Sequence, residues 1–330
     1  MTPHVQVVST GGTIASTGDG VDSGKTPTES GEALLEAVPE LESIASIDVV
    51  DVCHVSGFQM DFERAASALD ACERAGADGV DGVVVTHGTD TMAETAYYAD
   101  SVLETDIPVV FTGSQRSFDQ LGTDGPTNLL AAVETAADER FRDAGGVYLA
   151  FNDGVHAARD VVKAHTSKLE TFVSTERGPI AEFAPSGLRL LREPGRYAPR
   201  FPGERIDPEV RIVLVTNAMG VDGTTVERAL ESGTDGIVVA GTGLGNTTGP
   251  LGTTLESALD GGVPVVLCSR CHAGTTAGVY GGDGGARTLV DAGAVLGGDL
   301  PSWKARLTLA LSVSAGRDVN EVFDGIDSLD

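Results

Sequence analysis

Residues 80–103 read VDGVVVTHGTDTMAETAYYADSVL and contain one complete strand–turn–helix unit. The run Val80–Thr86 is rich in valine and does not alternate apolar with polar residues, which is typical of a strand buried on both faces of a parallel sheet. Met92–Leu103 carries apolar residues at helical spacing, so we expect a helix there. The polar residues between them then lie at the carboxyl end of the strand, where open parallel sheets bind their ligands.

The same alternation of strand-like and helix-like segments runs along the rest of the chain. Further apolar runs of strand length are Val5–Val8, Ile47–Val52, Val109–Thr112, Val147–Phe151, Ile212–Thr216, Gly236–Ala240 and Val263–Cys268. Segments with helical spacing lie between them at Glu32–Ala37, Asp61–Ala75, Asn128–Arg140, Thr225–Ser232 and Thr253–Leu259. This pattern predicts an α/β fold whose parallel strands are joined by right-handed crossovers.

A change of composition divides the chain into two parts. Leu191–Glu209 contains four prolines and several charges without apolar periodicity, as is typical of a linker. We therefore expect a larger N-terminal catalytic domain, residues 1–190, and a smaller C-terminal α/β domain, residues 210–330.

The charge of the chain excludes some partners. With 49 acidic and 22 basic residues among 330, the formal net charge is −27, which repels both nucleic acid and anionic membranes. A compact body with this charge needs counterions, and at about 1 M salt the Debye length falls to roughly 3 Å. We expect a protein of a very salty cytosol, such as that of a halophilic archaeon. An ordinary acidic protein is the alternative.

The termini and cysteines add two expectations. Residues 1–10 lack the basic and apolar regions of a signal peptide, and no apolar run reaches membrane-spanning length, so we expect a soluble, cytoplasmic protein. Cys268 and Cys271 form a Cys-x-x-Cys beside His272, but no second ligand pair follows at zinc-site spacing. We interpret Cys268 as a buried strand residue and expect no metal.

Two loops concentrate groups that can carry chemistry. In Thr10-Gly-Gly-Thr-Ile-Ala15, two glycines permit a sharp turn and place the hydroxyl of Thr13 at the end of the first strand. The glycine-rich stretch Ser16–Thr28 that follows has the length of a lid. An ordinary strand-end turn is the alternative for this loop taken alone.

The second loop, Thr86–Ala96, gathers hydroxyl and charged groups at the start of a helix. We expect Thr89 or Asp90 as its N-cap and Glu94 in its first turn. Free backbone N–H groups at this end of a helix favour an anion such as a carboxylate. Capping needs only one such residue, whereas here a cluster stands beside a histidine, so we favour a functional role.

Two later segments raise further candidates. Lys163 and Lys168 stand in a chain with only four lysines, and a lysine, unlike an arginine, has a pKa that can shift. Composition alone does not indicate which of these two lysines has a functional role. The stretch Gly241-Thr-Gly-Leu-Gly-Asn246 partly resembles a dinucleotide fingerprint, but Thr247–Pro250 follows it instead of an immediate helix.

These groups together indicate hydrolysis by a hydroxyl nucleophile, which needs a base for its proton and donors for the developing oxyanion. Thr13 supplies the hydroxyl, and Lys163 with Asp90 and Thr89 relays protons. The chain contains no Gly-x-Ser-x-Gly to support a serine hydrolase.

Thr10–Ala15 and Thr86–Ala96 resemble the two signature segments of the bacterial-type L-asparaginases. Further segments similar to that family are Thr112-Gly-Ser-Gln-Arg116, Thr123–Leu129, Asn152–Lys163 and Lys304-Ala-Arg306, so the resemblance covers nearly the whole chain. It implies a larger Rossmann-like domain and a smaller α/β domain, assembled as a homodimer or homotetramer. It also implies hydrolysis of L-asparagine to L-aspartate and ammonia without a cofactor.

The resemblance also implies roles for individual residues. Thr13 matches the nucleophile, and Thr89, Asp90 and Lys163 match the second catalytic group, with Asp90 also holding the substrate amino group. The expected substrate-binding residues are Gln59, Ser56, Gly88 and Asn246, of which Asn246 approaches the site of a neighbouring subunit.

The chain departs from the family pattern in two places. Asp22–Thr28 lacks the usual lid tyrosine, and Phe58 stands where many members have a substrate-binding serine. Three other functions stay open. One is an amidotransferase subunit releasing ammonia for tRNA-bound glutamate, although that branch carries an extra N-terminal domain and the first strand here starts near Val5. The others are a non-catalytic amino-acid sensor and a nucleotide-binding oxidoreductase built on Gly241–Asn246.

Overall fold

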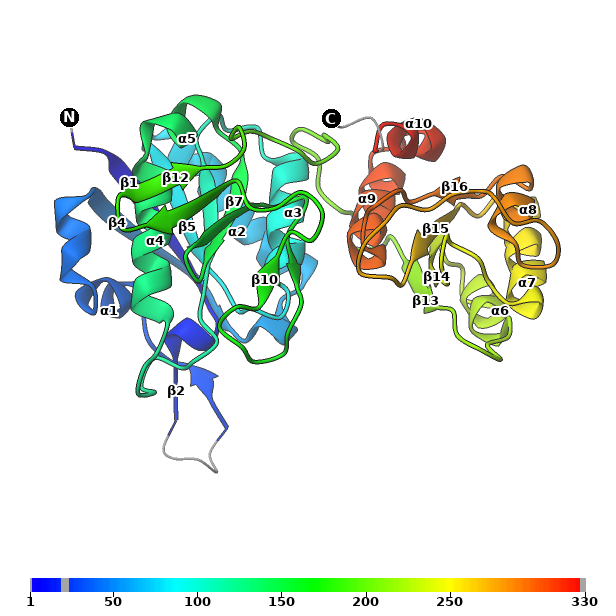
Figure 1. Cartoon of the computed structure of the whole chain (residues 1–330), viewed down its shortest axis with the longest axis horizontal. Helices are drawn as coiled ribbons and strands as arrows, with labels where there is room; N and C mark the ends of the chain where they lie inside the picture. Colours follow the sequence, from blue (N-terminus) through cyan, green and yellow to red (C-terminus); the bar gives the residue numbers. More distant parts are fainter. Residues whose placement is uncertain (1, 19–23, 327–330) are drawn as a thin grey trace. The chain divides into compact units, whose positions relative to one another are not determined.

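The computed structural model describes residues 2–18 and 24–326. It divides the chain into two compact units, Met1–Gly203 and Glu204–Asp330, which we call unit 1 and unit 2. Each unit is a sheet covered by helices (Figure 1). None of the helices in the described ranges combines the length and apolarity required to cross a bilayer.

Unit 1 is built on an eight-stranded sheet with the order β12-β11-β8-β7-β6-β5-β1-β4. Its parallel strands are β1 His4–Gly11, β4 Ser46–Val55, β5 Gly82–Thr86, β6 Val109–Thr112 and β7 Val147–Phe151. Three antiparallel strands that the sequence did not indicate extend it: β8 Gly154–Ala157, β11 Ala181–Ala184 and β12 Gly187–Leu190. Since every apolar run expected before residue 190 forms a parallel strand, the predicted α/β class is confirmed.

The strand β4 differs from the expectation of burial on both faces. It is the edge strand beside β1, and its side chains alternate between half-buried and exposed, with Val50 37% exposed. An edge position removes the neighbour that would cover one side of a strand. The prediction of a fully buried strand at Ile47–Val52 was therefore wrong, because burial depends on strand order.

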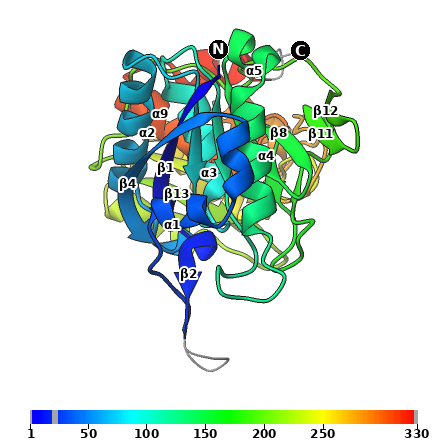
Figure 2. The same cartoon turned by 90° about the vertical axis from the view of Figure 1, so that its left-hand side faces the viewer.

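Helices cover both faces of this sheet. The helices α1 Gly31–Glu36 and α4 Gly125–Ala137 share one apolar core with it, and α2 Phe62–Ala77 and α3 Met92–Val102 pack on the other face. Figure 2 shows α2 and α4 on opposite sides. The smaller elements of the unit are η1 Thr13–Ala15, β2 Ser16–Thr17, β3 Thr26–Pro27, η2 Pro39–Ser43, η3 Gly57–Gln59, α5 Glu139–Ala144, β9 Val162–Lys163 and β10 Phe172–Val173.

One crossover has an unexpected hand. The connections β5–α3–β6 and β6–α4–β7 step in the same direction across the sheet, yet α3 and α4 lie on opposite faces. The two crossovers therefore have opposite hands, and the expectation of right-handed crossovers throughout was wrong. The long connection 113–124 between β6 and α4 permits the exception, because it carries the chain across the carboxyl edge of the sheet.

The strand order also determines where a ligand can bind. Along β4-β1-β5-β6-β7 the chain order reads second, first, third, fourth and fifth, so the order reverses between β1 and β5. Open α/β sheets bind ligands beyond the carboxyl ends of the strands at such a reversal. The loops that begin at Thr10 and at Thr86 follow these two strands and so meet at this point.

The segment expected to be a linker is only partly free of unit 1. Ala198 and Phe201 are buried, and the carboxylate of Asp100 on α3 accepts hydrogen bonds from the backbone N–H of Tyr197 (3.2 Å) and of Ala198 (3.0 Å). Arg200 donates to the carbonyl oxygen of Leu103 at 2.6 Å. Residues 191–203 therefore pack on unit 1, and unit 2 begins at Glu204.

Unit 2 contains a four-stranded parallel sheet in chain order: β13 Ile212–Thr216, β14 Gly236–Gly241, β15 Val265–Ser269 and β16 Val295–Leu296. The helices α6 Thr224–Glu231, α7 Gly249–Asp260 and α8 Ala286–Asp291 share the core of one face. The helix α9 Ser302–Ser314 packs on β13, β14 and β15, and α10 Val319–Asp324 contacts α9 and β16. Nearly every side chain of α9 from Lys304 to Ser312 is buried, so α9 lacks the apolar periodicity that would have revealed it in the sequence.

Candidate active site

The loop that carries Thr13 turns sharply at two glycines. Gly11 and Gly12 have φ values of 95° and 83°, a region that side-chain-bearing residues rarely adopt. The Gly12 N–H donates to the carbonyl oxygen of Val55 at 2.9 Å, and the Ser16 hydroxyl donates to the Gly12 carbonyl at 2.8 Å. Thr13 follows as the first residue of η1, half-buried at the carboxyl edge of the sheet.

Three glycines bring three loops into direct backbone contact. A Cβ atom placed on Gly12 would lie 2.5 Å from the Gly88 nitrogen, and one placed on Gly57 would lie 2.8 Å from the Gly88 carbonyl carbon. A Cβ on Gly88 would collide with the Gly57 backbone. Thr13 follows Gly12, Thr89 follows Gly88, and Gly57 is the first residue of η3. The contacts among the three glycines therefore hold Thr13, Thr89 and η3 close together.

Lys163, from the separate two-stranded sheet β9-β10, completes this arrangement. It lies in β9, and its Nζ donates to Thr89 Oγ1 at 2.9 Å and to Asp90 Oδ1 at 2.7 Å. The side chain of Lys163 is 17% exposed and that of Asp90 is 53% exposed, so solvent reaches the carboxylate. The structure therefore joins Lys163 to Thr89 and Asp90, which lie more than 70 residues earlier in the sequence, in one hydrogen-bonded group.

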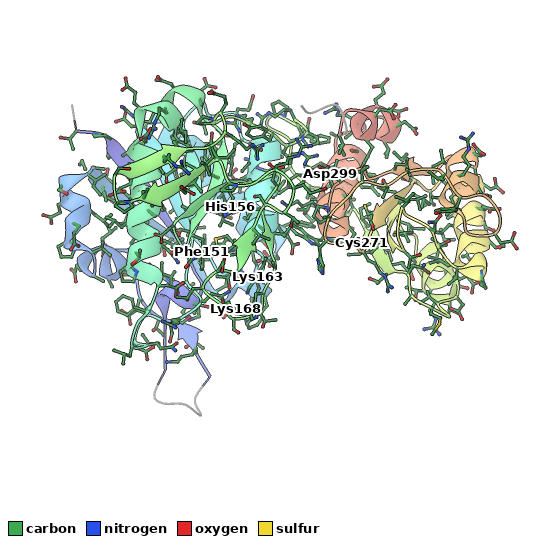
Figure 3. All side chains as sticks on the ribbon, viewed as in Figure 1. Phe151, His156, Lys163, Lys168, Cys271 and Asp299 are labelled. Atoms are coloured by element: carbon green, nitrogen blue, oxygen red, sulfur yellow. The ribbon has the colours of Figure 1, made fainter. Side chains whose placement is uncertain are left out.

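The two lysines that composition left equivalent, both labelled in Figure 3, make different contacts. Lys168 is exposed, and its backbone N–H donates to the ring of His165 at 3.0 Å. Of the two, only Lys163 is hydrogen-bonded to the described residues after β5, which is consistent with a proton-transfer role for Lys163 and a surface role for Lys168.

The start of α3 differs from the expectation. The N-cap is Thr91, not Thr89 or Asp90, and Glu94 lies in the first turn as expected. Thr91 donates its hydroxyl to the Gly57 carbonyl oxygen at 2.6 Å and makes no side-chain capping bond. The prediction was wrong because Thr91, the residue directly before the helix, takes the N-cap position, which leaves Thr89 and Asp90 free of capping.

The turn η3 and its N-cap Ser56 contain three of the residues considered for substrate binding or specificity. The Ser56 N–H donates to Gln59 Oε1 at 3.3 Å in a capping box, and Gln59 itself is exposed. The Phe58 side chain is 72% exposed. Because Gly57 of this turn touches Gly88, both Ser56 and Gln59 lie on the loop nearest the Thr89 group.

Asn246 belongs to unit 2. Its Oδ1 accepts the Ala286 N–H at 3.0 Å, and a bridge between Thr242 and Asn246 closes the glycine-rich loop on itself. The N–H groups of Thr242, Gly245 and Asn246 all bond within this loop, so they are not available to a phosphate. The sheet of unit 2 also has no reversal of strand order among its described strands, which argues further against a dinucleotide site there.

The four cysteines are free. Cys268 is buried in β15 as the sequence predicted, and burial raises the pKa of its thiol to about 12. Cys271, labelled in Figure 3, is exposed. Within residues 2–18 and 24–326, no three His, Cys, Asp or Glu side chains cluster as a metal site would require.

The lid expected at Ser16–Thr28 is described only at its two ends, because residues 19–23 lie outside the described residues. Its arms are the antiparallel strands β2 and β3. Lys25 and Gly18 both bond to the carboxylate of Asp119, with a Lys25 Nζ–Oδ1 distance of 2.9 Å. The lysine bond holds the pKa of Asp119 down, at about 2.

Comparison with known proteins identifies the family to which this site belongs. A family model described as the N-terminal part of asparaginase matches residues 4–196, and one described as the glutaminase/asparaginase C-terminal domain matches residues 211–324. The chain belongs to the asparaginase family. The two matches together include the loops after β1 and β5, β9 with Lys163, and the Asn246 loop.

Individual relatives of this asparaginase-family chain have more than one function. L-asparaginase 2 of Escherichia coli is 35% identical over 249 residues, which cover 74% of this chain and 71% of that protein. A glutamyl-tRNA(Gln) amidotransferase subunit of Methanothermobacter thermautotrophicus is 36% identical over 248 residues, but the match spans only 57% of that protein. The crystal structure of a probable cytoplasmic L-asparaginase from Campylobacter jejuni has a TM-score of 0.86 at 28% identity and covers 98% of this chain and 99% of its own.

Several residues of this site were not indicated by the sequence. Gly57 and Thr91 join the turn η3 to the loop after β5, and neither was assigned a role. The available signal was a glycine at a strand end or two residues beyond it, which recurs at Gly11, Gly57 and Gly88. His87 was expected only as a neighbour of the polar cluster, whereas it is fully buried against the Gly88 carbonyl.

Proposed function

We propose that this chain is an L-asparaginase that hydrolyses L-asparagine to L-aspartate and ammonia with Thr13 as the nucleophile. The observation that supports it best is the Lys163–Thr89–Asp90 group, with bonds of 2.9 and 2.7 Å, on a loop whose Gly88 abuts the Gly12 backbone beside Thr13. An amide held between the two loops meets a hydroxyl on one side and a lysine–carboxylate pair on the other.

In this proposal the Thr13 hydroxyl attacks the side-chain amide carbon and passes its proton to the Lys163–Asp90 pair, with Thr89 in the relay. The backbone N–H of Thr89 donates to no described residue, so it is available to the oxyanion that develops on the amide oxygen. The relayed proton then leaves with ammonia. Water hydrolyses the resulting Thr13 ester to release aspartate and restore the hydroxyl.

Substrate recognition in this proposal uses Gln59, Ser56 and the backbone at Gly88, and Asp90 holds the substrate amino group. Asn246 is proposed to act from the unit 2 of a second copy, so the active species is a homodimer or homotetramer. Cross-complementation tests this: mixing inactive Thr13→Ala and Asn246→Ala chains should restore activity only if subunits share sites.

The replacement Thr13→Ala tests the nucleophile. It should reduce ammonia release from L-asparagine to background while circular dichroism and the melting temperature stay near those of the wild type. Thr13→Ser is the matched control, because it keeps a hydroxyl and should retain measurable turnover. Wild-type turnover in Thr13→Ala would rule out Thr13 as the attacking group.

The similarity to an amidotransferase subunit supports a second candidate, the release of ammonia for tRNA-bound glutamate. Ammonia release from free L-asparagine and from L-glutamine, each with and without glutamylated tRNA and at low and molar salt, separates the two. Release that requires the tRNA favours the amidotransferase. Tight aspartate binding without ammonia release under every condition favours the non-catalytic sensor.

A further inference from the structure

His87 lies directly before the glycine on which the three loops meet. Its side chain is fully buried, and its Nδ1 lies 2.8 Å from the carbonyl oxygen of Gly88. A carbonyl oxygen can only accept a hydrogen bond, so Nδ1 carries the proton and Nε2 presents a lone pair. Among the described residues, nothing donates to this buried Nε2.

The carbonyl bonded by His87 belongs to the peptide unit that joins Gly88 to Thr89. In a trans peptide the C=O and N–H point in opposite directions. A bond that holds the Gly88 oxygen toward the buried imidazole therefore turns the Thr89 N–H away from the imidazole. Glycine permits rotation of this unit because it lacks the side chain that would restrict its backbone.

The orientation of this peptide unit affects the reacting groups on both sides. Gly88 is in contact with the backbones of Gly12 and Gly57, and Thr89 and Asp90, next along the chain, bond to Lys163. A rotation at Gly88 would move the Thr89 hydroxyl away from Lys163 and reverse the Thr89 N–H. Within the described part of the chain, no other side chain donates to the Gly88 carbonyl.

We propose that His87 is a positioning residue for the amide hydrolysis proposed above, acting through its Nδ1–H bond to the Gly88 carbonyl and not through contact with substrate. The expected effect on kcat/KM rests on the proposed function. The expected effect on the Gly88–Thr89 peptide unit does not.

The competing explanation is that His87 only fills space. Its ring lies 6.1 Å from that of Phe111, so it does contribute to packing in the core. The two explanations differ in which replacement is tolerated. A packing role is best satisfied by an apolar side chain such as leucine, whereas a positioning role requires a donor at the place of Nδ1. The Asn Nδ2 can reach that place, while the Gln amide reaches the place of Nε2.

The test compares His87→Asn, His87→Gln and His87→Leu. We expect His87→Asn to keep kcat/KM within about tenfold of the wild type, and His87→Gln and His87→Leu to lose about 100-fold, the effect of a misplacement near 1 Å. The matched control is His156→Leu, which removes another buried imidazole that bonds to Ser174 Oγ at 3.0 Å, away from this loop. It should leave kcat/KM unchanged at temperatures well below its melting point.

Hydrogen exchange of the backbone amides 88–91 gives a readout that needs no substrate. Exchange should accelerate at least tenfold in His87→Leu and His87→Gln, and stay near wild type in His87→Asn and His156→Leu. Equal activity and equal exchange in His87→Leu and His87→Asn would overturn the proposal. If the wild type releases no ammonia while the exchange pattern holds, the proposed function fails and the positioning role stands.

Discussion

At the residue scale, the contacts of Lys163 indicate the function of a residue type that is rare in this chain. Lysine supplies four of the 22 basic residues, and the surface otherwise uses arginine. Lys163 is mostly buried and bonds to both a hydroxyl and a carboxylate. An arginine cannot give up its proton near neutral pH, whereas a lysine beside a carboxylate can exchange one with a reacting group.

We expect Lys163→Met to lower kcat for L-asparagine by about 10²–10⁴-fold, the usual contribution of a positioned acid or base. Lys163→Arg should be nearly as inactive, because it keeps the charge but not the transferable proton. Lys168→Met is the control and should have wild-type kinetics, since Lys168 is exposed. Steady-state ammonia release measures all three. Full activity of Lys163→Arg would contradict proton transfer by Lys163.

Two buried histidines predict a loss of stability in mild acid. Burial lowers the pKa of both His87 and His156 to about 4, whereas an unfolded histidine has a pKa near 6.5. The unfolded chain therefore binds more protons between these values, so the stability is fully present above pH 6.5 and is lost as the pH falls toward 4. Each histidine contributes a slope of about 1.4 kcal/mol per pH unit.

Chemical denaturation at fixed salt between pH 7 and pH 4.5 measures this effect. His156→Gln should remove about 1.4 kcal/mol per pH unit from the dependence of the unfolding free energy. His272→Gln, at an exposed position, should leave that dependence unchanged. An unaltered slope in His156→Gln would show that this imidazole is charged, or not buried, in the folded protein.

At the element scale, the candidate active site depends on close approach between strand-end loops. The glycines Gly12, Gly57 and Gly88 begin the connections that follow β1, β4 and β5, and each occupies a position where a methyl group would meet backbone atoms. Backbone atoms cannot move aside as a flexible side chain can. Adding a single carbon atom at one of these glycines would therefore disrupt the contact between the loops. The bond from the Thr91 hydroxyl to the Gly57 carbonyl then ties the start of α3 to the same place.

Gly88→Ala should therefore lower the unfolding free energy by roughly 1–3 kcal/mol, the usual cost of overpacking, and reduce kcat/KM by about 100-fold through displacement of Thr89. Gly195→Ala is the control, since a methyl group there meets no atom within 4 Å. Urea denaturation and ammonia release measure the two effects. A Gly88→Ala variant with wild-type values in both would show that the loops do not need this contact.

At the scale of the whole molecule, the net charge of −27 is the dominant property. Arginine side chains neutralise some of the carboxylates locally. The buried carboxylate of Asp160 lies within 3.2 Å of Arg159 and 2.8 Å of Arg192, and Arg200 anchors the segment after β12. The remaining acidic surface repels itself, and we propose that the protein works in concentrated salt.

The midpoint of thermal unfolding should rise by roughly 10 °C between 0.1 and 2 M KCl, because screening at a Debye length of a few ångströms removes the self-repulsion. Chloride is the salt to use, since sulfate strengthens apolar burial whatever the charge. Scanning calorimetry or circular dichroism measures the midpoint. A midpoint that is constant or falls over this range would identify an ordinary acidic protein and remove the argument for a salty cytosol.

The sequence by itself determined the α/β class, every parallel strand of the two sheets except β16, and the two threonine loops, because apolar runs and strand-end glycines are local patterns. It also indicated Lys163 as one of two candidates. Composition left Lys163 and Lys168 equivalent, and the family resemblance favoured Lys163. Only the tertiary structure gave Lys163 its contacts with Thr89 and Asp90, exposed β4 as an edge strand, moved the N-cap of α3 to Thr91 and reversed the hand of one crossover. These features depend on which strands become neighbours. Strand order is set by the packing of distant segments, which no local pattern records.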